Sequence, residues 1–184
     1  MDFWDIYDQH YLKVKKFILA VVRDECAADD LCQETFMRVQ NSLDTLKDES
    51  KVSAWIFRIA YNLCRDHFRK LKVRGAGERA NDAGTQIAVP SSIHKELEQR
   101  EMSQCVQEQV NLLPESLRSV IILFDLMGCT HEEVSEILGI TRDAVKVRLH
   151  RARKKLKALL ETACAFETDE RNVLICEPRG CSNT

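Results

Sequence analysis

Apolar residues recur every three or four positions along most of this chain, which is the spacing of amphipathic helices. Helices are predicted from about residue 2 onward and over residues 24–40, 53–71, 95–113 and 115–127. We see no segment that alternates apolar and polar residues in the manner of a β-strand. The pattern therefore predicts an all-α fold.

Glycine and proline separate these helices into two groups. Gly75, Gly77, Gly84 and Pro90 fall close together, in a stretch without helical periodicity that is typical of a linker. We therefore expect two small helical domains, residues 1–74 and 95–160, joined by a flexible linker over residues 75–94. Residues 161–184 form a tail beyond the second domain.

The segment from Thr130 to Thr141 is typical of two helices joined by a tight turn. Thr130 followed by Glu133 fits a capping box, in which each residue caps the other. Gly139 can take the left-handed conformation that ends a helix, and Thr141 can cap the helix after it. This order of elements predicts a helix-turn-helix.

The helix after Thr141 has a basic face opposite an apolar stripe. The stripe consists of Val145, Leu149, Ala152 and Leu156. Residues 142–157 contain eight Lys or Arg residues and one acidic residue. An ordinary solvated helix can carry such charge, but after a capped glycine turn the basic face predicts contact with the major groove of DNA.

A second polar face lies on the helix over residues 53–71. Arginines next to an aromatic ring and an amide suit a nucleic-acid strand whose bases are unstacked. The residues of this face are Arg58, Tyr61, Asn62, Arg65 and Arg69. Taken alone, Asn62 could be an ordinary surface residue, and Trp55 on the same helix is expected in the core.

Three polar residues share one face of the helix over residues 24–40. Asp30, Gln33 and Glu34 are spaced at i, i+3 and i+4. An acidic face of this kind can meet a basic protein partner. Acids near a helix start also complement the helix dipole, and the residues alone do not decide between the two interpretations.

Composition narrows the class of protein. The net charge of −2 does not identify a nucleic-acid binder, so the distribution of charge carries that argument. No apolar run reaches the roughly 18 residues of a membrane helix, and the start Met1-Asp2 is not that of a secretory signal. We expect a cytoplasmic protein with no membrane partner and reduced cysteines. We find no convincing nucleophile–base set or phosphate loop, so no enzyme is predicted.

Several short runs, taken in order, resemble extracytoplasmic-function (ECF) sigma factors of RNA polymerase. The runs are ADDLCQETF at residues 28–36, WIFRIAYN at 55–62, LP at 113–114, EILGI at 136–140 and AVKVRLHRAR at 144–153. The resemblance covers roughly residues 5–160. It implies core polymerase (its β′ and β subunits) and promoter DNA as partners, and an anti-sigma factor as a further candidate.

The resemblance also implies roles for matching positions. Asp30, Gln33 and Glu34 would dock on the β′ coiled coil. The helix with Trp55 and Asn62, and the loop over about residues 47–53, would capture the opened −10 strand. The −35 element would be contacted by Thr141, Arg142, Lys146, Val147, Arg148, His150, Arg151 and Lys154. Val147 stands where the family often has a small polar residue, so no −35 sequence is carried over.

The tail contains three of the chain's eight cysteines, Cys164, Cys176 and Cys181. Thiolates bind zinc, copper(I) or cadmium, although these cysteines do not form a CxxC pair. Some sigma factors of this kind carry metal-responsive cysteine-rich extensions, and this tail resembles one. We expect no required cofactor, and regulation through the tail either by a metal at these thiols or by their oxidation state.

The competing interpretation is a one-component helix-turn-helix regulator with a metal- or redox-sensing tail. Such a protein would bind a palindrome as a dimer, without polymerase. A sigma factor would instead bind core polymerase and support initiation by it.

Overall fold

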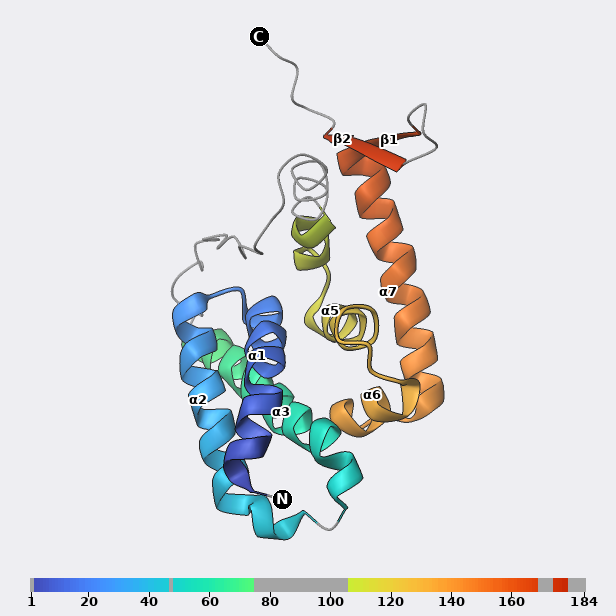
Figure 1. Ribbon diagram of the computed structural model, residues 1–184. Coiled ribbons are helices and arrows are strands. Elements are labelled where there is room, and N and C mark those ends of the chain that lie inside the picture. Colours follow the sequence, from blue (N-terminus) through green and yellow to red (C-terminus); the bar gives the residue numbers. More distant parts are fainter. Residues whose placement is uncertain (1, 47, 75–105, 169–173, 179–184) are drawn as a thin grey trace. The chain divides into compact units, whose positions relative to one another are not determined.

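The computed structural model describes residues 2–46, 48–74, 106–168 and 174–178 (Figure 1). The chain divides into two compact units, Met1–Thr85 with Ser119–Lys146, and Gln86–Arg118 with Val147–Thr184. The predicted linker, residues 75–94, lies outside the described residues, and the predicted domain boundaries remain a prediction.

Three helices begin the first unit: α1 (Phe3–Val22), α2 (Glu25–Ser42) and α3 (Val52–Arg74). Arg23, at φ 63°, ends α1 in the left-handed conformation, and the Asp24 carboxylate accepts the Ala27 N–H at 2.7 Å to start α2. Two 3₁₀ turns, η1 (Leu43–Thr45) and η2 (Glu49–Lys51), lead into α3. All three helices were predicted, with ends within about three residues.

The core of this helical group lies where α1, α2 and α3 pack together. Phe17 of α1 and Phe57 of α3 meet edge to face, with ring centroids 5.3 Å apart. Burial of such a side chain stabilises the fold by about 1.5–3 kcal/mol. The fully buried side chains here include Ile6, Val14, Phe17, Ile18, Val21, Val39 and Ile56.

The segment after residue 114 forms α5 (Glu115–Ile121), a π-helical turn η3 (Ile122–Leu126) and α6 (His131–Leu138). One helix was predicted over residues 115–127. Its last turn is wider instead, because the Met127 N–H bonds to the Ile122 carbonyl at 2.9 Å, and Gly128 then turns the chain at φ 72°. Within the first unit, α6 contacts α3 and η3 contacts α1.

The long helix α7 (Arg142–Ala163) is followed directly by a hairpin of β1 (Cys164–Thr168) and β2 (Leu174–Pro178). The strands are antiparallel, with Cys164 opposite Pro178 and Phe166 opposite Cys176. Strands were not predicted, because five-residue runs give little alternation to detect, although Phe166, Thr168 and Ile175 favour them. Apart from this hairpin and the turns, the regular structure of the described residues is helical, as predicted. No helix in the described ranges has the length and apolarity needed to span a membrane.

Candidate nucleic-acid interface

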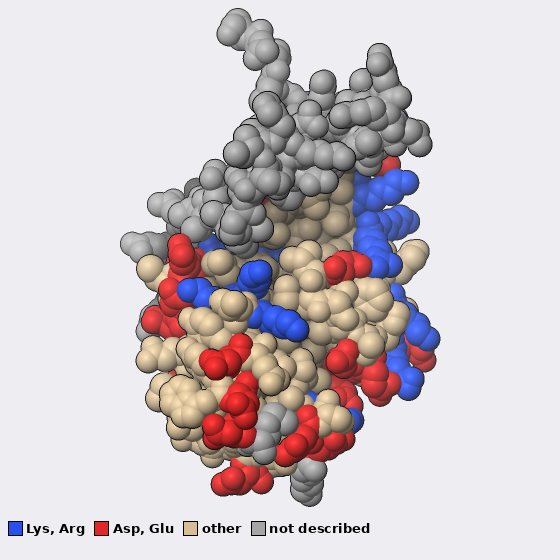
Figure 2. Space-filling model, viewed as in Figure 1, with Lys and Arg blue, Asp and Glu red and all other residues tan. Residues whose placement is uncertain are grey.

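The helix α7 has the two faces that its sequence predicts. Val145, Leu149 and Ala152 are at most 4 % exposed. On the opposite face, His150, Arg151 and Lys154 are exposed. Figure 2 shows Lys and Arg side chains in a column along this helix. The buried stripe thus fixes the rotation of α7 and leaves the basic face open to a partner.

Both helices on either side of the turn before α7 are capped, and α6 starts with a reciprocal capping box. The Thr130 hydroxyl oxygen accepts the Glu133 N–H at 3.2 Å, and the Glu133 carboxylate accepts the Thr130 N–H at 2.7 Å. Gly139 closes α6 at φ 65°. The Thr141 hydroxyl accepts the Ala144 N–H at 3.2 Å. These bonds confirm the predicted helix-turn-helix and show that Thr141 acts as a helix cap.

The other predicted −35 residues have different surroundings. Arg142 pairs with Glu132 of α6, with 2.5 Å between Nε and Oε2, and Lys146 lies 3.5 Å from Asp143. Val147 is 49 % exposed on the outer face. Arg148 is half-buried, unlike the exposed residues of the outer face, because it flanks the apolar stripe. The structure thus brings seven of the eight residues onto the start and outer side of α7, and places Arg148 at the edge of its buried stripe.

Four of the five predicted −10 residues form a continuous polar face on α3. Arg58, Arg65 and Arg69 are exposed, and Asn62 is half-buried between them. Tyr61 was predicted on the same polar face, and this placement was wrong, since its ring is only 7 % exposed. It lies four residues after buried Phe57 and three before buried Cys64, so helical geometry turns it toward the core.

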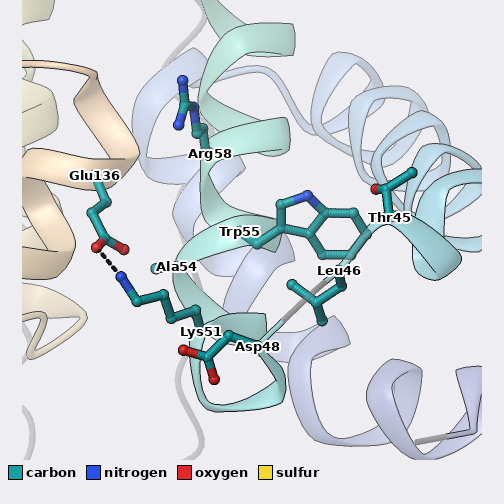
Figure 3. Close-up of a pocket in the computed structure, with 8 residues that line it drawn as sticks. All are labelled: Thr45, Leu46, Asp48, Lys51, Ala54, Trp55, Arg58 and Glu136. Carbon is teal, nitrogen blue, oxygen red and sulfur yellow. Dashed lines mark hydrogen bonds and ion pairs between the residues drawn. The ribbon is translucent and has the colours of Figure 1, made fainter.

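A cavity of about 420 Å³ lies beside this face (Figure 3). Trp55, which was expected in the core, is half-buried and lines the cavity. Its other lining residues are Thr45, Leu46, Asp48, Lys51, Ala54, Arg58 and Glu136. The cavity therefore combines an aromatic wall with two cations, Lys51 and Arg58, and two carboxylates, Asp48 and Glu136.

An ion pair closes one side of the cavity. Lys51 Nζ lies 2.5 Å from Oε1 of Glu136 on α6 (Figure 3). The hydrogen bond to Glu136 raises the pKa of Lys51, because it stabilises the charged ammonium form. Asp48 accepts both the N–H and the hydroxyl of Ser50, which shapes the loop before α3.

The predicted polymerase-docking face on α2 is accessible. Asp30 and Gln33 are exposed. Glu34 is half-buried and pairs with Arg38 one turn later, with 2.8 Å between Oε1 and Nε. The three side chains share a face, as predicted, and because Glu34 pairs with Arg38, Asp30 is the less constrained of the two acids.

The tail cysteines are only partly described. Cys164 is buried at the junction of α7 and β1. Cys176 lies on β2 opposite Phe166, two positions from the residue opposite Cys164. Cys181 lies outside the described residues. Metal binding by these three cysteines remains a prediction.

Sequence reasoning missed Thr45, Leu46 and Glu136 as cavity residues and Glu132 as the partner of Arg142. The first two follow the last turn of α2, where no pattern marks them. Glu132 and Glu136 are spaced at i and i+4 on the polar side of α6, which is the one signal that could have suggested a shared role.

Comparison with known proteins supports this arrangement. The family model "Sigma-70 region 2" matches residues 6–74, and "Sigma-70, region 4" matches residues 103–156. The RNA polymerase sigma factor SigZ of Bacillus subtilis is 36 % identical, covering 92 % of this chain and 93 % of its own. The ECF RNA polymerase sigma factor SigM of the same organism is 33 % identical, covering 84 % and 93 %.

Two solved structures have the same fold. RpoE of Bartonella quintana, crystallised with the anti-sigma factor NepR, gives a TM-score of 0.70 over 87 % of this chain and 97 % of its own, at 24 % identity. CnrH, solved with the cytosolic domain of CnrY, gives 0.64 over 87 % and 88 %, at 26 % identity. Both sigma-70 regions are thus present in the predicted order, and the chain belongs to the ECF family of RNA polymerase sigma factors.

Proposed function

We propose that this sigma factor reads the −35 element with the outer face of α7 and captures the opened −10 strand on α3. The observation that carries the proposal is the geometry of α7, where His150, Arg151 and Lys154 are exposed opposite a buried stripe behind a capped turn. Such a helix can enter a major groove while the preceding helix crosses the backbone. Polymerase catalyses RNA synthesis, and this chain is assigned no catalytic step. Because it would act together with core polymerase, we also assign it to the cytoplasm.

We assign the −10 strand to the face formed by Arg58, Asn62, Arg65 and Arg69. Arginine side chains can follow the backbone, and the Asn62 amide can bond a base edge. The neighbouring cavity suits one base turned out of the stack, since Trp55 offers a ring for stacking and Arg58 a cation. In this proposal the Glu136 carboxylate must leave Lys51 before DNA enters, because it would otherwise compete with a DNA phosphate for the Lys51 ammonium group.

Docking on core polymerase is assigned to Asp30, Gln33 and Glu34. Their exposed acidic face complements a basic helical surface on the β′ subunit. The solved structure of RpoE with the anti-sigma factor NepR makes an anti-sigma factor a further candidate partner.

Transcription with core polymerase tests the assignment of α7. Arg151→Ala should weaken initiation at a −35-dependent promoter by about tenfold, the cost of one good base or phosphate contact. Arg153→Ala is the matched control, because it removes the same charge about 160° around the helix. Equal losses for both variants would contradict the assignment of the outer face.

A second candidate function concerns regulation by the tail. Cys164 and Cys176 occupy diagonal positions on paired strands, about 7–8 Å apart between α-carbons. That separation exceeds the usual 4.4–6.8 Å of a disulfide, so it favours a bridging metal over direct oxidation. We propose that zinc, copper or cadmium, bound by Cys164, Cys176 and Cys181, changes how α7 meets DNA.

Metal content and promoter activity, measured on the same anaerobic preparation, test the tail. Changing the three tail cysteines to serine should remove bound metal and its effect on initiation, whereas Cys26→Ser on α2 should do neither. If the triple variant binds as much metal as the wild type, the proposed site is wrong, while the assignments to DNA and polymerase are unaffected.

A further inference from the structure

The first residue of α7 carries a charge that helix stability does not explain. Arg142 begins the helix, where its positive charge opposes the helix dipole. An acidic residue stabilises such a position, as Asp143 does next to it. A residue that departs from a local rule in this way is expected at a functional site. Arg142 is therefore a candidate for a contact outside its own helix.

An ion pair joins Arg142 to the preceding helix. Its Nε lies 2.5 Å from Oε2 of Glu132, in the first turn of α6. The pair thus spans the turn of the helix-turn-helix and links the first turns of its two helices. The Arg142 and Glu132 side chains are 60 % and 54 % exposed, and ion pairs on such a surface contribute little to stability. The main effect of the pair is therefore to fix the direction of the arginine side chain.

The other two acids of α6 have different partners. Glu133 belongs to the capping box at the start of the helix. Glu136 pairs with Lys51, at the cavity beside α3. Each glutamate of α6 is thus engaged in a different direction, and Glu132 is the one that holds a side chain of α7.

The ion pair uses the nitrogen of Arg142 that lies nearest the side-chain stem. It leaves the N–H groups of Nη1 and Nη2 for a second acceptor, because a guanidinium group carries several donors in a rigid fork. Guanine presents two matching acceptors, O6 and N7, in the major groove, and arginine bound to both is the commonest specific contact with DNA. The N-terminal residues of a recognition helix are those that reach base edges. Arg142 has both the position and the free donors for such a contact.

The charge of the pair favours a base over a phosphate as the target. Binding to phosphates releases counterions, and this requires positive charge that is not already neutralised. Glu132 neutralises Arg142, and its carboxylate repels a phosphate brought close to it. The uncharged edge of a base has no such conflict. The pair is therefore suited to base recognition.

We propose that Glu132 is a positioning residue for −35 recognition, which holds Arg142 so that Nη1 and Nη2 meet a guanine in the major groove. Glu132 acts through Arg142 and bonds no base itself. This inference rests on the proposed contact of α7 with the −35 element. It deepens that proposal by naming the class of base and the residue that aims the arginine.

Base preference tests the inference, with the full chain bound to core polymerase. Binding is measured to a promoter that this sigma factor uses and to its single base-pair substitutions through the −35 element. Replacing the guanine should cost the wild type about tenfold, and Arg142→Ala should abolish that preference. Glu132→Ala should weaken the preference at the same base pair by about threefold or more. The double variant should show no loss beyond that of Arg142→Ala, because both residues act in one contact.

Two further variants serve as controls. Glu132→Gln keeps an acceptor oxygen for Nε and should retain part of the preference. Glu161→Gln also removes one carboxylate, from an exposed residue of α7 about 28 Å along the helix from Arg142. It should leave the preference unchanged. If Glu161→Gln loses as much preference as Glu132→Ala, the effect belongs to overall charge and the inference is overturned.

The other base pairs of the −35 element separate positioning from a structural role. A variant with a disturbed helix-turn-helix would lose its preferences at all pairs together. Loss in Glu132→Ala at a single pair, with the others retained, is the result expected of a positioning residue. Loss at all pairs alike would mean that Glu132 only supports the fold, and would overturn the inference.

Salt dependence gives an independent measurement. The double variant removes a pair that is already neutral, so the slope of log affinity against log salt should not change. A slope reduced by about one would show that Arg142 binds a phosphate. The same conclusion follows if Glu132→Ala strengthens binding to all sequences alike and keeps the full preference for guanine. Either result overturns the inference.

Failure of the inference and failure of the proposed function give different results. If Arg151→Ala weakens initiation while Arg142→Ala keeps every base preference, α7 still contacts the −35 element and the inference is wrong. If Arg142→Ala abolishes a preference that Glu132→Ala retains, Arg142 reads the base without help from Glu132. If neither Arg151→Ala nor Arg142→Ala has any effect, the assignment of α7 itself is wrong.

Discussion

The capping box at the start of α6 should contribute measurably and non-additively to the stability of the helix-turn-helix. Thr130 and Glu133 share three hydrogen bonds: Glu133 N–H to the Thr130 hydroxyl, Thr130 N–H to the Glu133 carboxylate, and the hydroxyl to the same carboxylate at 2.9 Å. Thr130→Ala removes the two that involve the hydroxyl. Loss of such a cap costs about 1 kcal/mol, within a range of about 0.5–2.

The bond between the two side chains is lost in either single variant, so the two effects should overlap. Glu133→Ala should cost about as much as Thr130→Ala. The double variant should then cost less than the sum, by about the 0.5–1.5 kcal/mol of one hydrogen bond. Thr130→Ser keeps the hydroxyl and serves as the control.

Hydrogen exchange at the amides of Glu133 and Val134 measures this locally, whichever part of the chain unfolds first. A loss of 1.4 kcal/mol corresponds to a tenfold lower protection factor. Strictly additive single-variant effects, or unchanged protection in Thr130→Ala, would refute the reasoning from the reciprocal bonds.

Three further predictions concern charge and protonation. Lys154→Ala should reduce the slope of log affinity against log salt by about one and weaken binding to all DNA sequences alike, as measured by titration at several salt concentrations. Burial raises the pKa of Cys32 to about 11, so in iodoacetamide labelling at pH 8 followed by mass spectrometry it should react far more slowly than exposed Cys26; equal rates would contradict burial. Burial also lowers the pKa of His10 below 6.5, so its contribution to stability is complete above pH 6.5 and is lost as pH falls below it. His10→Gln should flatten urea-unfolding stability between pH 7.5 and pH 5, and an unchanged pH dependence would show that His10 is not its source.

The helices and caps could be predicted from the sequence because each depends on near neighbours. Val145, Leu149 and Ala152 define the buried side of α7 by spacing alone. Thr130 and Gly139 mark the ends of α6 through chemistry within three or four residues. The same locality explains why the predicted docking and −35 residues share their faces.

The missed features depend on contacts between residues that are far apart in the sequence. Trp55 lines a cavity whose wall includes Glu136, 81 positions later, and no periodicity within α3 indicates this. Tyr61 has the polarity of a surface residue, but it lies at the edge of the buried side of α3. The packing of Tyr7 and Tyr11 on Phe36 of α2 was also missed, because the spacing of the two tyrosines on α1 does not indicate which residue of α2 they meet.

The junction between α7 and β1 has a mechanical consequence. Ala163 ends the helix and Cys164 begins the strand, with no residue between them to act as a hinge. A helix of 22 residues is about 33 Å long, so a tilt of about 10° at the hairpin moves its other end by roughly 6 Å. That displacement exceeds the length of a hydrogen bond by a factor of about two. In the proposed regulation by the tail, a small rearrangement at Cys164 would thus displace the start of α7 by more than the length of a hydrogen bond.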